Sequence, residues 1–169
     1  MEINRLAPDF KLRDIVGDLH SLRDTRGRIT ILNFWSCECP HVVRTDRALL
    51  AKCAVWGADV AMLSIASNRI ESLEAITAAA HERGLPLVLQ DPQHAVADLY
   101  EAQTTPEVFV IDRDGMLRYR GAVDDVNFSR RIPTRAYVDE AVEALLAGRL
   151  PRLAETPAFG CAIVREAVE

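Results

Sequence analysis

The sequence has few cysteines: its 169 residues include only Cys37, Cys39, Cys53 and Cys161. A chain of this length with 49% hydrophobic residues can build its own core, so four cysteines are too few for a fold that disulfides hold together. A structural zinc site is also disfavoured, because the Cys37-x-Cys39 pair has no second cysteine pair to complete four ligands. Any cysteine chemistry should therefore be local.

The sequence also lacks an excess of basic charge and any long hydrophobic run. Its 20 Lys and Arg residues are scattered among 25 Asp and Glu residues, which excludes the basic patch of a nucleic-acid-binding protein. No apolar run approaches the roughly 18 residues of a membrane span, and residues 1–14 do not resemble a signal peptide. We expect one domain over residues 1–169, cytoplasmic and bound to neither nucleic acid nor membrane, with its oligomeric state left open.

Hydrophobic patterning predicts alternating strands and helices in the first half of the chain. Short apolar runs rich in branched side chains indicate buried strands at residues 28–35, 59–66 and 86–90. Apolar residues at helical spacing follow Pro40 and, after the second strand, run from Leu73 to a stop at Gly84. Asp91 and Pro92 have the residue types of a helix cap and first turn, so we expect a short helix there.

The second half predicts a hairpin, a helix and a tail. Residues 107–121 are typical of two strands joined at a turn around Gly115. Thr134 is expected to cap the last helix, which Gly148 ends. Residues 1–27 are interpreted as an N-terminal extension and residues 149–169 as a C-terminal tail. This order predicts an α/β fold with a mixed central sheet flanked by helices.

Several stretches resemble the thioredoxin superfamily. "ILNFWSCECP" (residues 31–40) is similar to the strand and active-site turn of its redoxin members, which include AhpC/TSA-related thiol-disulfide oxidoreductases. "QTTPEVFVIDRDG" (103–115) is similar to the segment with that family's cis-proline. "YRGAVDD" (119–125) and "ETPAFGCAIV" (155–164) resemble bacterial redoxins that end in Gly-Cys-x-Ile. The resemblance spans nearly the whole chain and implies a thioredoxin-like fold.

The resemblance assigns roles at the Cys-Pro corner. Cys39 falls at the family's attacking thiol, and Pro40 and His41 fill the two positions that follow it. Val42 replaces the usual second cysteine, and Ser36 stands where the closer subgroup has its upstream cysteine. Neither standard dithiol is therefore intact.

Physical chemistry supports Cys39 as the nucleophile. The N-terminus of a helix presents unsatisfied backbone N–H groups and the positive end of the helix dipole, which favour a thiolate. A protonated His41 would favour it further, although a solvent-facing histidine in the first turn is an equal alternative. For Cys39 itself, the alternative is a small buried residue at a helix start.

The partner that resolves a disulfide at Cys39 is left open between two cysteines. Cys53 lies 14 residues further along the same helix, about 21 Å away, beyond the reach of a disulfide. Cys37 could bridge only in a small, strained ring. Cys161 lies on a tail that could bring a distant thiol to the corner. Alternatively, Cys37 is a small turn residue and Cys161 a packed anchor of the tail.

Pro106 is expected to follow a cis peptide bond. Such bonds are uncommon and usually lie in tight, fixed turns. In the resembled family this turn faces the thiol, and the residue before the proline, here Thr105, pairs through its backbone with an extended substrate. A trans proline at the start of an edge strand is the alternative.

Three functions follow from these residues. The first is a thiol-disulfide oxidoreductase that acts on protein or small-molecule disulfides through a mixed disulfide and needs no cofactor. The second is a peroxiredoxin-like peroxidase, suggested by Ser36-x-x-Cys39, although Pro106 replaces that family's peroxide-orienting arginine. The third is a Cu(I) carrier that uses Cys37, Cys39 and His41. We expect the first.

Overall fold

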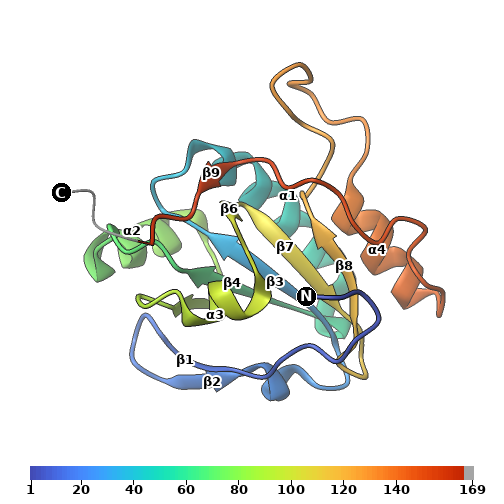
Figure 1. Ribbon diagram of the computed structural model, residues 1–169, viewed down its shortest axis with the longest axis horizontal. Helices are drawn as coiled ribbons and strands as arrows, with labels where there is room; N and C mark the ends of the chain where they lie inside the picture. The colour runs from blue at the N-terminus through green and yellow to red at the C-terminus, as the bar shows by residue number, and fades with distance from the viewer. Residues whose placement is uncertain (166–169) are drawn as a thin grey trace.

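Figure 1 shows a computed structural model of the chain, which describes residues 1–165. The strands are β1 (Lys11–Asp14), β2 (Leu19–Ser21), β3 (Ile29–Trp35), β4 (Val60–Ala66), β5 (Val88–Gln90), β6 (Thr104–Thr105), β7 (Glu107–Ile111), β8 (Leu117–Gly121) and β9 (Cys161–Ala162). The helices are α1 (Pro40–Trp56), α2 (Leu73–Arg83), α3 (Ala95–Tyr100) and α4 (Tyr137–Leu146), with 3-10 turns at Leu22–Thr25 and Gly57–Asp59.

Seven of the strands form one mixed sheet in the order β2-β1-β5-β4-β3-β7-β8. β3 pairs in parallel with β4 and antiparallel with β7. Both β3 and β4 are buried along their whole length, as their continuous apolar runs predict. The predicted mixed central sheet is confirmed, and β3, which leads into Cys39, lies inside it.

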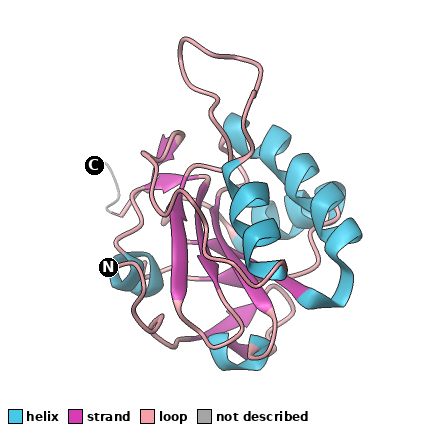
Figure 2. Ribbon diagram, turned by 90° about the vertical axis from the view of Figure 1, so that its right-hand side faces the viewer, coloured by secondary structure: helices cyan, strands magenta, loops and turns pink. Residues whose placement is uncertain are grey.

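Helices pack on both faces of the sheet (Figure 2). Successive side chains of a strand point to opposite faces, so β3 contributes to two cores. On one face Ile31 packs with Leu49 of α1 and Val142 of α4. On the other face Phe34 packs with Tyr100 of α3. The sheet is therefore covered on both sides, and β3 is held firmly from each.

The segment interpreted as an N-terminal extension is part of the sheet. β1 pairs antiparallel with β2 and with β5, and so adds two strands to one side of the sheet. Leu19 of β2 is exposed, and β1 has one buried residue, Asp14. The apolar pattern of these strands is too weak to predict them, because their pairing is mostly through the backbone.

The short helix after β5 begins later than predicted. Its first residue is Ala95, and its N-cap residue is His94 in the left-handed conformation, with φ 49°. Pro92 lies in the turn before it. The Asp91 carboxylate nevertheless accepts the N–H groups of Val96 at 3.2 Å and Ala97 at 3.0 Å. Asp91 therefore satisfies the helix N-terminus from outside the cap position.

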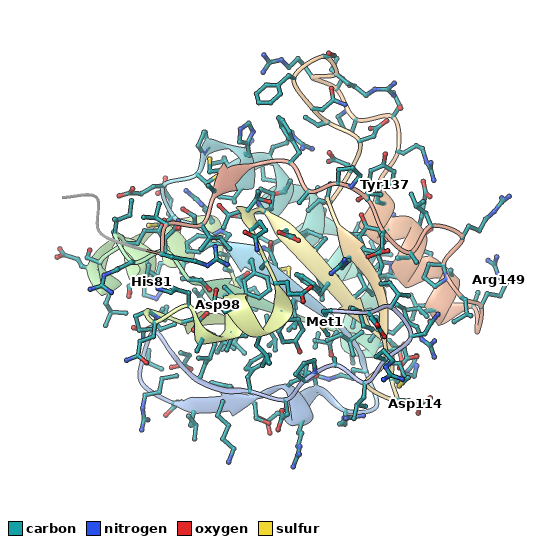
Figure 3. All side chains as sticks on the ribbon, viewed as in Figure 1. Met1, His81, Asp98, Asp114, Tyr137 and Arg149 are labelled. Carbon is teal, nitrogen blue, oxygen red and sulfur yellow. The ribbon has the colours of Figure 1, made fainter. Side chains whose placement is uncertain are left out.

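The predicted cap of the last helix is also wrong. α4 begins at Tyr137, and its N-cap residue, Ala136, makes no side-chain cap hydrogen bond. Thr134 instead donates its hydroxyl to Asp125 at 2.6 Å. This contact closes the base of a loop over residues 125–135, which protrudes from the molecule in Figure 1. Figure 3 labels Tyr137 at the foot of that loop.

Other local predictions are confirmed. β7 and β8 form the predicted hairpin, whose turn contains Gly115 with φ 85°. α2 ends at a left-handed Gly84, as predicted. Across residues 1–165, no helix has the length and apolar character needed to cross a membrane.

Candidate functional site

The corner between β3 and α1 places Cys39 at a helix N-terminus. Cys39 is the N-cap residue with extended backbone, and Pro40 follows in the first turn, where its missing N–H sacrifices no helical hydrogen bond. Within the described residues, the Cys39 side chain makes no cap hydrogen bond to the N–H groups of the first turn. Cys39 is only 3% exposed. The sulfur thus lies at the N-terminus of α1 but is almost fully covered.

The predicted cis-proline turn faces this sulfur. The Thr105-Pro106 peptide bond is cis, as predicted. The Cys39 Sγ lies 3.1 Å from the carbonyl oxygen of Thr105, within hydrogen-bonding distance. Thr105 is 1% exposed, and its own hydroxyl has no partner within residues 1–165. The backbone of Thr105, rather than its side chain, therefore makes the polar contact to the sulfur.

The tail brings Cys161 to the same place. β9 pairs antiparallel with β6, so that Cys161 lies opposite Thr105 (Figure 1). The Sγ atoms of Cys39 and Cys161 are 2.8 Å apart, less than 1 Å longer than a disulfide bond of about 2.05 Å. Burial and the neighbouring Cys39 sulfur raise the pKa of Cys161 to about 11. The structure thus brings together two cysteines that are 122 positions apart.

Cys37 lies in a different environment. Burial raises the pKa of its thiol to about 12, and the negative charge of the nearby Glu71 carboxylate raises it further. The Glu71 carboxylate also accepts the Ser36 hydroxyl and, at 3.2 Å, the N–H of Glu38. The turn before Cys39 is therefore built around Glu71, and Cys37 is kept as a neutral thiol.

We predict that Glu71→Gln speeds the alkylation of Cys37. Removing the negative charge lowers the pKa of Cys37, so the reactive thiolate fraction at a given pH rises about tenfold for each unit by which the pKa falls. Iodoacetamide labelling between about pH 7 and 9, followed by peptide mapping, measures it. Glu74→Gln, an exposed charge change on α2, is the control. Unchanged labelling of Cys37 in Glu71→Gln would contradict the assignment.

Arg83 holds the other side of the turn. Its guanidinium donates to the Cys37 carbonyl at 2.8 Å and lies over the ring of Trp35, 5.3 Å from the ring centroid. It also pairs with Asp46 at 3.5 Å, and the Asp46 carboxylate accepts the Trp35 indole N–H at 3.0 Å. Burial raises the pKa of Asp46 despite these partners. α1, α2 and β3 are thus cross-linked immediately beneath the cysteines.

The ring of His41 contacts an aromatic side chain of the tail. Its ring packs edge-on against Phe159 of the tail, with centroids 5.0 Å apart, and Phe159 meets Phe128 of the protruding loop at 4.9 Å. Within the described chain, His41 makes no hydrogen bond to Cys39, and the choice between a cation that favours the thiolate and a solvent-facing histidine stays a prediction. His41 and Phe159 line a small hollow together with Pro106.

Three residues of the site were not predicted from the sequence. Glu71 follows no motif, and nothing local links it to Cys37. Glu107 fixes β6, because its Oε2 accepts the N–H groups of Gln103 at 2.8 Å and of Thr104 at 3.2 Å. Gly160 passes so close to the Thr105 carbonyl that a side chain could not fit between them. The Gly-Cys pair in the tail was the one signal available for Gly160.

The described residues contain no group of three or more His, Cys, Asp or Glu side chains that could hold a metal ion. Cys37, Cys39 and His41, the ligand set of the Cu(I) alternative, therefore do not converge. The candidate site is a pair of sulfurs, Cys39 and Cys161, beside the cis-proline turn.

Two proteins of named function are similar to this chain in sequence. Thiol-disulfide oxidoreductase ResA of Geobacillus kaustophilus (strain HTA426) is 29% identical over 121 residues, which cover 69% of this chain and 67% of that protein. Thiol:disulfide interchange protein DsbE of Tatumella citrea is 29% identical over 126 residues, which cover 72% and 66%. These names describe those proteins.

Solved structures share the fold. The crystal structure of a hypothetical protein from Sinorhizobium meliloti 1021 matches with a TM-score of 0.89 and 29% identity, over 100% of this chain and 97% of that one. The AhpC/TSA family profile matches residues 3–120, more than half of the sequence. The chain therefore belongs to the AhpC/TSA family, among the redoxins of the thioredoxin superfamily.

Proposed function

We propose that the protein is a thiol-disulfide oxidoreductase in which Cys39 attacks a disulfide and Cys161 resolves the mixed disulfide. The observation that carries this proposal is the 2.8 Å approach of the two sulfurs beside the Thr105 carbonyl. The substrates are protein or small-molecule disulfides, the class that the names of the ResA and DsbE relatives indicate. The cytoplasmic location stays a prediction.

Geometry favours Cys161 over Cys37 as the resolving thiol. Attack on a disulfide needs a thiolate that can reach the sulfur. Cys161 is already in contact with Cys39, whereas burial and the negative charge of Glu71 raise the pKa of the Cys37 thiol to about 12. A disulfide between Cys37 and Cys39 would also close a very small, strained ring.

The exchange runs in two balanced steps. The Cys39 thiolate attacks one sulfur of the substrate disulfide, the mixed disulfide forms, and the other sulfur leaves as a thiolate that takes up a proton. Cys161 then loses its proton, attacks the Cys39 sulfur, and releases the second substrate sulfur as a thiolate. The protein dithiol loses two electrons and the substrate gains them. The neighbouring Cys39 sulfur, which helps to raise the pKa of Cys161, is no longer charged in the mixed disulfide.

Peroxidase activity is the second candidate, and the side chains around Cys39 do not favour it. Cleavage of an O–O bond needs donors aimed at the developing charge. Arg44 makes a paired contact with Asp124, and Arg120 pairs with Glu155 and Glu101. The Ser36 hydroxyl donates to Glu71. The groups that could replace the missing arginine are thus engaged elsewhere.

We predict fast exchange with a small disulfide and slow reaction with hydrogen peroxide. Stopped-flow oxidation of the reduced protein by each reagent measures both rates. The peroxide rate should match that of an ordinary cysteine thiolate, because no donor is preorganised for the leaving oxygen. Free cysteine at the same pH is the reference. A peroxide rate orders of magnitude above the reference would make the protein a peroxidase.

A further inference from the structure

The tail covers the sulfur that the proposed function uses. Cys39 is 3% exposed, and its Sγ contacts Cys161 of β9 and the Thr105 carbonyl of β6. β9 occupies the open side of β6 (Figure 1). A strand can pair with one neighbouring strand along each of its two edges. An external polypeptide can therefore reach β6 and Cys39 along this side only after β9 leaves.

We propose that residues 159–163 occupy β6 as a tethered competitor of the substrate, and that the Thr105 carbonyl selects substrates in which the reactive cysteine directly follows a glycine. This inference rests on the proposed role of Cys39. It adds the class of polypeptide substrate and the segment of the chain that blocks substrate binding. Its model for the bound substrate is the tail itself, which places a cysteine sulfur 2.8 Å from Cys39.

The glycine requirement comes from the Thr105 carbonyl. A Cβ atom added to Gly160 would overlap the carbonyl oxygen and carbon of Thr105 and would meet the nitrogen of Pro106 at 3.0 Å. Gly160 is not among the glycines with positive φ, so its backbone conformation is open to any residue. The requirement is therefore steric. Because Thr105 O also contacts the Cys39 sulfur, the carbonyl cannot move aside without disturbing the reacting atoms.

The residue two positions after the cysteine is buried in the hydrophobic core. Ile163 is 5% exposed and packs in the same core cluster as Phe34 and Tyr100. Its N–H donates to the Gln103 carbonyl at 2.9 Å, which continues the pairing beyond β6. Ala162 between them is exposed. The site therefore fits the pattern Gly-Cys, any residue, then a branched aliphatic residue.

Because the tail is attached on both sides of β9, the return of β9 to β6 resolves the mixed disulfide and releases the substrate in one event. The tail is held before β9 by Thr156, whose hydroxyl contacts Tyr119 at 2.6 Å, and after it by Val164, whose N–H donates to Asn68 at 2.8 Å. While a substrate strand lies on β6, Cys161 is displaced. When β9 returns, Cys161 attacks the Cys39 sulfur of the mixed disulfide and the substrate leaves as a thiol. One strand site thus couples the second exchange step to product release.

The test uses the full chain carrying Cys161→Ser, so that the mixed disulfide at Cys39 is kept, and peptide mapping distinguishes an adduct on Cys39 from one on Cys37 or Cys53. The probes are acetylated peptides of residues 158–164, Ala-Phe-Gly-Cys-Ala-Ile-Val, with the cysteine activated as a thionitrobenzoate disulfide, and the same peptide with alanine in place of glycine. Release of thionitrobenzoate gives the rate. Cystamine, a small disulfide with no peptide backbone, reports on Cys39 itself.

We expect the glycine peptide to react at least about tenfold faster than the alanine peptide, the ratio expected when one extra methyl overpacks a fixed contact. Adding Gly160→Ala should raise the rate with the glycine peptide by about the same factor, because the tail no longer fits on β6. The control is Ala158→Ser, which adds one heavy atom in the tail outside β9.

The outcomes separate the two proposals. Equal rates for the two peptides, while cystamine reacts with Cys39, overturn the selection by the Thr105 carbonyl and leave the oxidoreductase standing. An unchanged rate in Gly160→Ala overturns the tail as a competitor. Failure of Cys39 to react with cystamine in every variant overturns the proposed function, and the substrate selection with it. The peptide comparison needs no change at Gly160, so poor folding of that variant does not affect it.

Discussion

Replacing Cys39 with serine is expected to lower disulfide reduction by at least about three orders of magnitude, because no other group can form the mixed disulfide. The Cys39 sulfur combines the N-terminus of α1 with contact to the cis-proline turn, and the remaining cysteines lack both features or depend on Cys39. Reduction of a small disulfide, with dithiothreitol as the electron donor, measures the loss.

Cys53→Ser is the matched control. Cys53 is on the same helix, about 21 Å from Cys39, and burial raises the pKa of its thiol to about 11. It packs against the core that Ile31 and Leu49 share. We expect its replacement to leave disulfide reduction within about twofold of the parent, as a conservative change away from the reacting atoms should. Equal losses in the two variants would show that the distinction between these thiols is wrong.

Replacing Cys161 with serine is expected to arrest the reaction at the mixed disulfide. In the parent, the tethered thiol attacks at an effective concentration in the millimolar range or above, whereas in the variant a second molecule must supply the thiol. At micromolar protein, resolution should slow by about a thousandfold. Intact mass after exposure to a small disulfide should show a stable adduct on Cys39 in Cys161→Ser.

Cys37→Ser provides the comparison for that experiment. Its thiol is engaged by Glu71, so its loss should leave the mixed disulfide as short-lived as in the parent. Peptide mapping of the oxidised parent should then yield one disulfide, between Cys39 and Cys161. A stable adduct in Cys37→Ser, together with rapid resolution in Cys161→Ser, would reverse the assignment of the resolving thiol.

The pH behaviour of the thiols follows from the same environments. The pKa of Cys37 is raised to about 12 in the folded protein from an ordinary value of 9.0, so the folded state keeps a proton that the unfolded chain loses in that range. The contribution to the free energy of unfolding is therefore complete below about pH 9 and is lost progressively as the pH rises from about 9 towards about 12. Alkaline conditions should therefore loosen the turn around Cys37.

The central strand, the helix that follows it and the position of Cys39 between them could all be predicted from the sequence alone. These features depend on short-range signals: a continuous apolar run at β3, a proline in the first turn of α1, and helical spacing after it. The mixed sheet was predicted from the order of strands and helices, and the cis bond before Pro106 from the resemblance; the structure agrees with both.

Helix ends were harder to predict because several polar residues compete for one cap. Asp91 and Thr134 both have suitable side chains, yet α3 begins at Ala95 and α4 at Tyr137. In each case the side chain found its partner from outside the cap position, through a turn whose geometry depends on the surrounding packing. A local preference for a cap residue cannot choose between such arrangements.

The groups that surround the reactive sulfur could not be predicted from the sequence, because they come from segments far apart along the chain. Sequence reasoning left Cys37 and Cys161 as equal partners, and the choice depends on where two distant segments pack. Glu71, on the loop before α2, reaches Cys37, while β9 pairs with β6 and brings Cys161 to Cys39 across 122 positions. Hydrophobic periodicity and helix-capping signals do not predict such long-range contacts. The pairing of β9 with β6 depends instead on the close fit of Gly160 against Thr105 and on the burial of Ile163 in the core.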